Sequence, residues 1–117
     1  MFFEKELEIH KKIFPLATPQ DQLWHLCEEL NEIDSSYDDQ DFNNMQKEWA
    51  DALFVAISLQ RFAHTRHLAN IMIYNLYEQY PRAIQTEIDG YLEKAIEKVK
   101  SRKYYFVNGR YERDKNV

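Results

Sequence analysis

Residues that interrupt helices are scarce in this chain, and this scarcity constrains the fold more than any other feature. Only 2 glycines and 3 prolines occur among the 117 residues. A many-stranded sheet needs frequent turns, which glycine and proline usually supply, whereas a few long helices need little of either. The sequence therefore predicts an all-α protein, folded as a single domain over residues 1–117.

Apolar residues at helical spacing divide the chain into five helical segments. The expected helices cover residues 3–13, 19–33, 42–63, 66–79 and 82–103. Thr18 is a typical N-cap for the second helix, because a proline and then an acidic residue follow it. We expect a polar loop over residues 35–41, an end to the fourth helix before Pro81, and an interruption of the fifth near Gly90.

The end of the chain departs from the helical pattern. Asn108 and Gly109 lie between two aromatic-rich stretches, and an Asn-Gly step in this setting is the strongest short-range signal for a hairpin. The predicted architecture is therefore a bundle of four to five helices with a small C-terminal hairpin or turn.

Two pairs of acidic residues lie in otherwise apolar helical segments. Glu29 and Glu32 form the first pair, and Glu48 and Asp51 form the second; each has i,i+3 spacing, so both side chains project from one helix face. Antiparallel helices joined by a short loop bring the pairs together. Carboxylates gathered in apolar surroundings are costly unless a cation joins them, and their oxygen atoms suit Mg²⁺, with Mn²⁺ as the alternative.

Basic residues gather in the second half of the chain. Residues 1–60 contain 13 acidic and 4 basic residues, whereas residues 61–117 contain 7 and 11. Lys94, Lys98 and Arg102 follow one another at i,i+4 spacing and so form one stripe on the last helix. We interpret this stripe as a phosphate-binding partner of the metal site. The net charge of −5 argues against a nucleic-acid partner.

Three further residues are candidates for contacts with a base or sugar. Gln22 and His25 lie two turns and one turn before Glu29, and Tyr105 offers a ring on which a base can stack. Which nucleotide they would select is left open by the sequence.

The composition also bears on location. One cysteine, Cys27, fits a reducing compartment, and no apolar run approaches the roughly 20 residues that span a bilayer. The charged N-terminal residues do not form a signal peptide. We expect a cytoplasmic protein without a membrane partner.

Four features follow one another along the chain: Glu28-Glu29-x-x-Glu32, Glu48-x-x-Asp51, a basic helix and an aromatic-Asn-Gly tail. This order resembles that of the MazG-like all-α nucleoside triphosphate pyrophosphohydrolases. These enzymes are related to the all-α dUTPases and the phosphoribosyl-ATP pyrophosphohydrolases. The resemblance covers residues 10–62 and 91–111, and we interpret residues 64–90 as a helical insertion. It implies a bundle that is completed by oligomerisation, as a homodimer or homotetramer.

The resemblance implies hydrolysis of a nucleoside triphosphate, ribo or deoxy, normal or modified, to the monophosphate and pyrophosphate by a water that bound Mg²⁺ activates. The metal ligands and catalytic residues would be Glu29, Glu32, Glu48 and Asp51. Lys98 and Arg102 match the phosphate-binding positions of the family best.

Two other interpretations use the same residues. In the first, the protein keeps this fold but catalyses no reaction, and serves as a helical module for oligomerisation or regulation. A di-iron bundle needs Glu-x-x-His motifs, and no histidine of this chain follows a glutamate by three positions.

Overall fold

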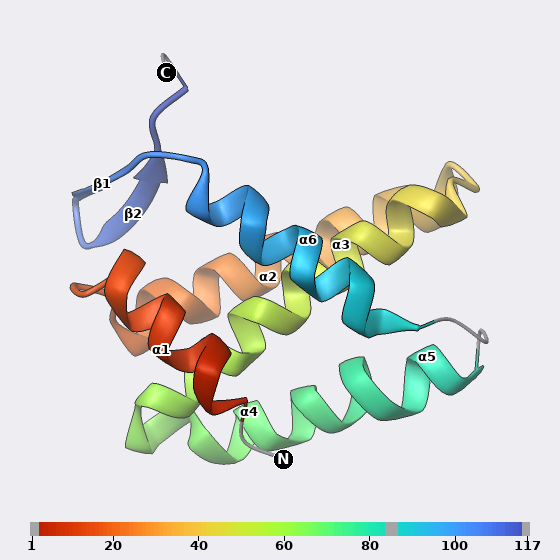
Figure 1. Cartoon of the computed structure of the whole chain (residues 1–117), viewed down its shortest axis with the longest axis horizontal. Coiled ribbons are helices and arrows are strands. Elements are labelled where there is room, and N and C mark those ends of the chain that lie inside the picture. The colour runs from red at the N-terminus through yellow and green to blue at the C-terminus, as the bar shows by residue number, and fades with distance from the viewer. Residues whose placement is uncertain (1–2, 84–86, 116–117) are drawn as a thin grey trace.

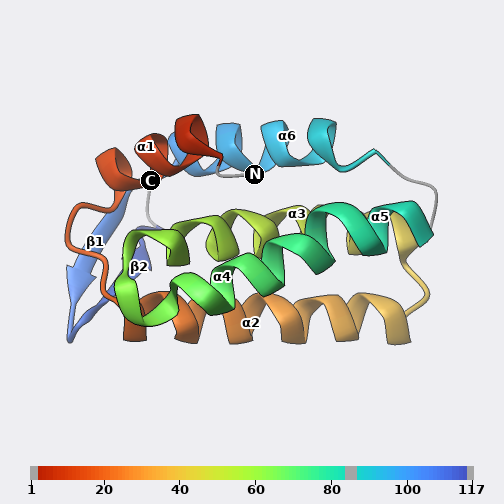
Figure 2. The ribbon, with the colours of Figure 1, turned by 90° about the horizontal axis from the view of Figure 1, so that it is seen from below.

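Helix α3 (Phe42–Ser58) lies at the centre of the molecule, and the other helices surround it. The computed structural model describes residues 3–83 and 87–115. In Figure 2, α2 (Pro19–Asp38) lies on one side of α3, and α1 (Glu4–Ile13) and α6 (Ile88–Lys100) lie on the other. The described part of the chain is therefore mostly helical, as predicted.

The core is built mainly on α3. Six of its residues have no exposed surface: Ala50, Ala52, Leu53, Ala56, Ile57 and Ser58. The alanines let the neighbouring helices approach closely, and α2 and α6 contribute further apolar side chains to the same cluster. This burial fixes the rotation of α3 about its axis, and hence the direction in which Glu48 and Asp51 project.

Helix α2 begins as predicted but is longer than predicted. The Thr18 side chain caps it by accepting a hydrogen bond from the backbone N–H of Asp21 (3.1 Å). The expected end near residue 33 is wrong, because the helix continues to Asp38, and only residues 39–41 of the expected loop over 35–41 lie outside a helix. Ser36 is buried against α3, where its hydroxyl accepts a hydrogen bond from Asn44 Nδ2 (2.8 Å), so a polar stretch of sequence became the last turn of a helix.

The third helix is shorter than predicted. α3 ends at Ser58, and two 3₁₀ turns follow it, at Leu59–Arg61 and Ala63–Thr65. The Thr65 hydroxyl donates a hydrogen bond to the Leu59 carbonyl (2.8 Å), which stabilises this tighter path. The predicted single helix over residues 42–63 is therefore wrong at its carboxyl end.

The next helical stretch continues past the proline that was expected to end it. α4 (Arg66–Ile73) leads into a π-helical segment (Tyr74–Gln79) and then into α5 (Tyr80–Ala83), which contains Pro81. Proline lacks a backbone N–H, and the wider π-helical turn before it shifts the hydrogen-bonding pattern and so lets the helix continue.

The last helix, α6, begins later than predicted. Gly90 lies in its first turn and does not interrupt it. Residues 84–86, which were expected to belong to this helix, lie outside the described residues. None of the helices in the described ranges is long and apolar enough to cross a membrane.

The predicted hairpin is confirmed. β1 (Tyr104–Val107) pairs antiparallel with β2 (Arg110–Arg113), and the two residues between the strands, Asn108 and Gly109, have φ of 53° and 81°. This left-handed pair is the conformation of a type I′ turn. Tyr111 fastens the hairpin to the start of the chain, because its hydroxyl accepts a hydrogen bond from the backbone N–H of Leu16 (2.8 Å). Figure 1 shows the hairpin at the carboxyl end of α6, beside α1.

A buried histidine joins α1 to the helices beneath it. Arg61 Nη1 lies 3.2 Å from His10 Nδ1, and since arginine only donates, Nδ1 must accept. The proton of His10 is then on Nε2, which donates to Gln22 Oε1 (3.2 Å). Burial, and then the charge of Arg61, lower the pKa of His10 from 6.5 to about 3. His10 therefore stays neutral in the folded protein.

This burial predicts a loss of stability in acid. The unfolded chain takes up a proton on His10 below pH 6.5 and the folded chain does not until about pH 3, so the contribution of His10 to stability falls as the pH falls below 6.5. Between pH 6.5 and 5, we expect wild type to lose roughly 2 kcal/mol relative to His10→Gln. Urea unfolding at each pH measures this difference. His67→Gln, at an exposed position, is the control, and an equal pH profile for wild type and His10→Gln would contradict the account.

Candidate metal centre

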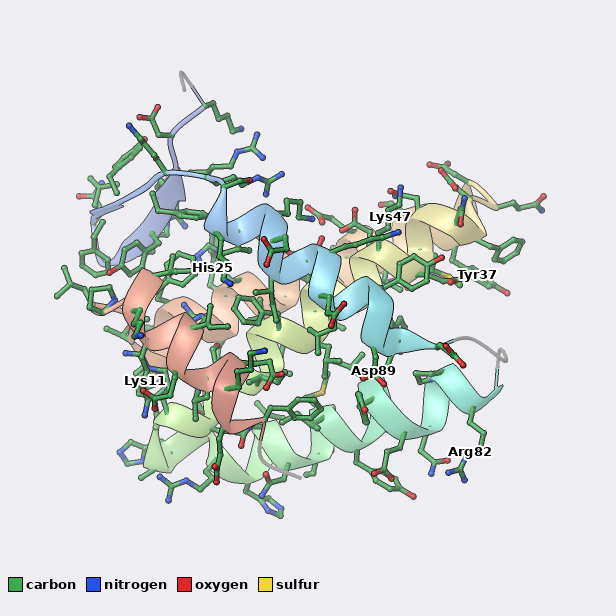
Figure 3. The ribbon with its side chains drawn as sticks, in the orientation of Figure 1. Lys11, His25, Tyr37, Lys47, Arg82 and Asp89 are labelled. Carbon is green, nitrogen blue, oxygen red and sulfur yellow. The ribbon has the colours of Figure 1, made fainter. Side chains whose placement is uncertain are left out.

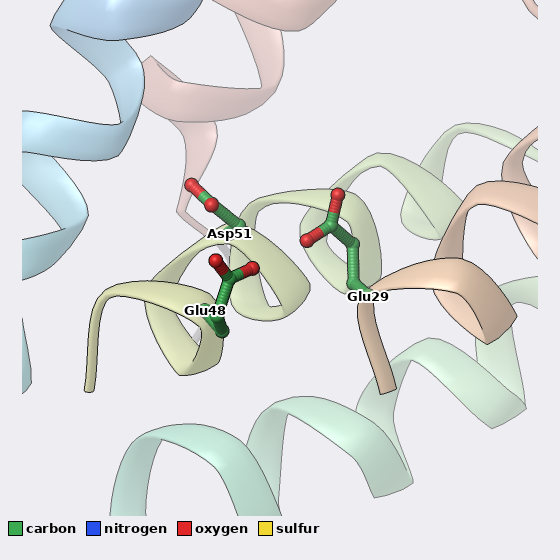
Figure 4. A group of neighbouring side chains, drawn as sticks. All are labelled: Glu29, Glu48 and Asp51. Carbon is green, nitrogen blue, oxygen red and sulfur yellow. The ribbon is translucent and has the colours of Figure 1, made fainter. Parts of the chain in front are cut away.

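Three of the four predicted acidic ligands converge between α2 and α3. Glu29 projects from α2 toward Glu48 and Asp51 on α3, as Figure 4 shows. One carboxylate oxygen from each residue lies within 4.8 Å of the other two, and each side chain is partly buried. These three residues could hold a metal ion.

Glu32 lies beside this group and not within it. It is exposed on α2, and its oxygen atoms are not among the three that converge. Its carboxyl group is nevertheless close enough to Glu29 and Glu48 to raise the pKa of both. A ligand set of four is therefore not formed in this structure, and Glu32 lies at its solvent-facing edge.

The proximity of these acids changes their protonation. Burial, and next the charge of Asp51, raise the pKa of Glu29 to about 9. Burial and the neighbouring Glu32 raise the pKa of Glu48 to about 8. Burial also raises the pKa of Asp51, although Lys98 opposes this effect. Without a cation, Glu29 and Glu48 hold protons at neutral pH that isolated carboxyl groups would lose.

Two oxygen atoms of the group are buried without a hydrogen-bond partner among the described residues. They are Oε2 of Glu29 and Oε2 of Glu48. An unsatisfied buried polar atom costs about 1–3 kcal/mol, and more when it is charged. A divalent cation would satisfy both atoms at once, and carboxylate oxygens are the ligands that hard cations such as Mg²⁺ prefer. The donor set therefore fits such an ion.

A cationic side chain from the last helix adjoins the acids. Lys98 Nζ donates a hydrogen bond to Asp51 Oδ2 at 2.7 Å, and the two form an ion pair. The charge of Arg102 also reaches Asp51. The predicted pairing of an acidic site with the basic end of the last helix is therefore present for these two residues.

Two of the three converging acids, Glu29 and Asp51, line one cavity of about 410 Å³ together with the basic residues, whereas Glu48 does not line it. The cavity lies at the hairpin end of the molecule, and Figure 3 shows His25 there, far from Tyr37 and Arg82 at the other end. One wall carries Glu29, Glu32 and Asp51, and the other carries Lys98 and Arg102. A ligand that combines a metal ion with phosphate groups would match both walls.

Two predicted binding residues do not reach the cavity. Lys94 is exposed one turn before Lys98, farther from the hairpin end, with its Nζ 5.7 Å from the centre of the Tyr91 ring. Tyr105 is 51% exposed and does not line the cavity. Side chains alternate along a strand, so Tyr105 points away from the side on which Tyr104 lines the cavity.

Gln22 and His25 do line the cavity, but protein groups engage their polar atoms. Gln22 Oε1 accepts hydrogen bonds from His10 and from the Ser58 hydroxyl (2.9 Å). The two ring nitrogens of His25 lie 3.1 Å from Asp21 and 3.3 Å from Glu28. Their placement agrees with the predicted base or sugar site, whose ligand stays a prediction.

The sequence interpretation missed several residues that complete the cavity. The main additions are Phe14, Phe54, Tyr104, Tyr111, Arg113 and Lys115. The hairpin signal could have indicated the last four, because pairing of the two strands places Arg113 opposite Tyr104, at the end of the basic helix.

Searches of protein-family models, curated proteins and solved structures found no match to this chain. The resemblance drawn from its motifs therefore stays a prediction, and the case for a function depends on the cavity itself.

The raised pKa values of the acidic group predict that removing one acid stabilises the metal-free protein but weakens its binding of metal. Because folding raises the pKa of Glu48 from 4.5 to about 8, its contribution to stability falls as the pH rises through that window in the absence of metal. In EDTA at pH 8, we therefore expect Glu48→Gln to raise the Tm and to remove most of the further rise that Mg²⁺ causes in wild type. Differential scanning fluorimetry measures both effects.

Glu93→Gln, at an exposed position on α6, is the matched control and should change neither value. A Mg²⁺-dependent rise in the Tm of Glu48→Gln as large as that of wild type would contradict the proposed ligand role.

Proposed function

We propose that this protein hydrolyses a nucleoside triphosphate between its α- and β-phosphates, in the presence of Mg²⁺, to give the monophosphate and pyrophosphate. The observation that carries the proposal is the convergence of Glu29, Glu48 and Asp51 beside a cavity that Glu29 and Asp51 line together with Lys98 and Arg102. An acidic wall facing a basic wall is complementary to a cation that bridges to phosphate. The motif resemblance supports the same reaction.

The acidic residues would bind the metal ion, and the basic residues would bind the phosphates. A divalent ion held by the three carboxylates would supply a water of lowered pKa and neutralise charge on the phosphates. Arg102 can bind phosphate oxygens with two parallel hydrogen bonds. Lys98, on the basic wall, forms an ion pair with Asp51 of the acidic wall. It would contribute a positive charge close to the reacting phosphate.

Which phosphate bond is cleaved depends on how the substrate lies between the walls. In the proposed reaction, the oxygen of water joins the α-phosphorus, the bond from that phosphorus to the bridging oxygen breaks, and pyrophosphate leaves with the bridging oxygen. Aromatic side chains of the cavity lining, such as Phe14 and Trp24, would then be available to the nucleoside.

The proposal predicts pyrophosphate release from at least one member of a nucleotide panel that includes dUTP, dCTP and modified purine triphosphates. We expect Glu48→Gln and Asp51→Asn to lower kcat by at least about a hundredfold, and Lys98→Met by about 10–100-fold, because each removes charge stabilisation at the reacting phosphate. A coupled pyrophosphate assay measures the rates, and circular dichroism confirms the helical fold of each variant.

Glu93→Gln again serves as the control. Absence of release from every nucleotide, together with no binding of Mg²⁺, would instead favour the non-catalytic module.

We also propose that the protein is a homo-oligomer, either a dimer or a tetramer. In support, α4 and the π-helical segment after it leave three large side chains exposed along one side: Leu68, Ile71 and Tyr74, at 37%, 47% and 52% exposure. Side chains three apart on a helix share a face, so these form one apolar strip.

Light scattering after size-exclusion chromatography is predicted to give a multiple of the chain mass of 14.2 kDa. Ile71→Asp should shift this mass toward that of one chain, because burying an unpaired charge at an interface is costly. Lys47→Asp, at an exposed site on α3, is the control. A single-chain mass for wild type would disprove the proposal.

A further inference from the structure

Basic side chains from two separate elements meet at the hairpin end of the cavity. Lys98 and Arg102 come from α6 and the residue pair after it, whereas Arg113 and Lys115 come from β2 and the residues beyond. A second hollow of about 240 Å³ adjoins the main cavity, and Arg102, Arg113 and Lys115 line both. These three residues are here called the basic rim.

The backbone holds the rim in place. The strand register sets Arg113 opposite Tyr104, directly after the basic end of α6. Beyond the strand, the backbone N–H of Asp114 donates to the carbonyl of Lys103 (2.8 Å), which extends the pairing to the residue before Lys115. Backbone pairing therefore joins the chain after α6 to the end of β2, where the basic residues of both lie.

Within the described residues, the rim differs from Lys98 in making no ion pair with an acidic side chain. Lys98 is paired with Asp51, but none of the three rim residues forms an ion pair with another residue of the described ranges. Arg102 hydrogen-bonds to the Tyr104 hydroxyl, and the charges of both Arg102 and Arg113 oppose the burial that raises the pKa of Tyr104. Two guanidinium groups thus lie near one hydroxyl group.

Such a group of like charges attracts anions, although Arg113 and Lys115 are exposed and solvent screens part of their repulsion. The dipole of α6 attracts cations to its carboxyl end, but only within about one turn of the helix, and it does not require residues from β2 to converge there. Phosphate oxygens would relieve the repulsion, since arginine binds two of them at once and lysine adds a point charge.

We propose that Arg102, Arg113 and Lys115 form a subsite for the pyrophosphate moiety: the two terminal phosphates of the substrate and, after cleavage, the released product. This inference rests on the proposed function and adds Arg113 and Lys115, from outside the motifs, to the binding residues. It implies that the protein selects triphosphates over monophosphates, because a triphosphate carries phosphate groups both for the acidic wall and for the rim.

The test is isothermal titration calorimetry of inorganic pyrophosphate into the full chain with Mg²⁺ present. We expect the double variant Arg113→Ala/Lys115→Ala to bind pyrophosphate at least about tenfold more weakly than wild type, because it loses charge-assisted hydrogen bonds. Arg113→Lys should keep part of the affinity, since it keeps the charge but loses the two-bond geometry. We also expect wild type to bind pyrophosphate more tightly than orthophosphate.

The matched control is Lys12→Ala/Lys100→Ala, which removes the same net charge from exposed positions that line neither hollow. Unchanged pyrophosphate affinity in Arg113→Ala/Lys115→Ala, an equal loss in the control, or equal affinity of wild type for orthophosphate would each overturn the inference.

The nucleotide assay separates this outcome from failure of the proposed function. Pyrophosphate release with unchanged affinity in the rim variant refutes the subsite alone. Rim-dependent pyrophosphate binding without turnover of any nucleotide upholds the subsite and refutes the hydrolase.

Discussion

Repulsion among carboxylates in a partly buried site is the constraint on which the rest of this structure depends. Glu29, Glu48 and Asp51 are held with oxygen atoms within 4.8 Å of one another by helices whose other faces are fixed in the core. The chain itself compensates only in part, through the ion pair of Lys98 with Asp51. Proton uptake by Glu29 and Glu48 relieves the remainder at neutral pH, and a cation would displace those protons.

The architecture gives this acidic group a basic counterpart. The fully buried small residues of α3, such as Ala52 and Ala56, let α6 approach it closely, so the last helix carries Lys98 to Asp51. The hairpin then folds back beside the end of α6 and adds further cations to the opposite wall. Opposite charges therefore line one cavity and are only partly paired with each other, which is the arrangement expected of a binding site for a ligand that carries both signs.

Local signals in the sequence predicted much of this structure. The scarcity of glycine and proline indicated helices, Thr18 indicated the start of α2, and the Asn108-Gly109 step indicated the hairpin. The i,i+3 spacing placed each acidic pair on one helix face, and three of the four expected ligands meet where α2 packs against α3.

The errors arose where tertiary contacts prevailed over local signals. Ser36 is polar in sequence but packs against α3, so α2 continues through a stretch that resembles a loop. Pro81 lies within helix because a π-helical segment precedes it. Lys94 shares a face with Lys98, but the cavity ends before it. Where the cavity ends depends on the packing of the hairpin, which the spacing of residues on one helix does not reveal.

The central claim is that the three carboxylates hold a divalent cation that bridges to phosphate. Crystals grown with Mn²⁺ and an α,β-imido nucleoside triphosphate, measured at a wavelength where manganese scatters anomalously, test it directly. The account predicts an anomalous peak among Glu29, Glu48 and Asp51, with phosphate density between that peak and Arg102. Bound nucleotide without a peak at the three carboxylates, or a manganese site elsewhere on the protein, would contradict it.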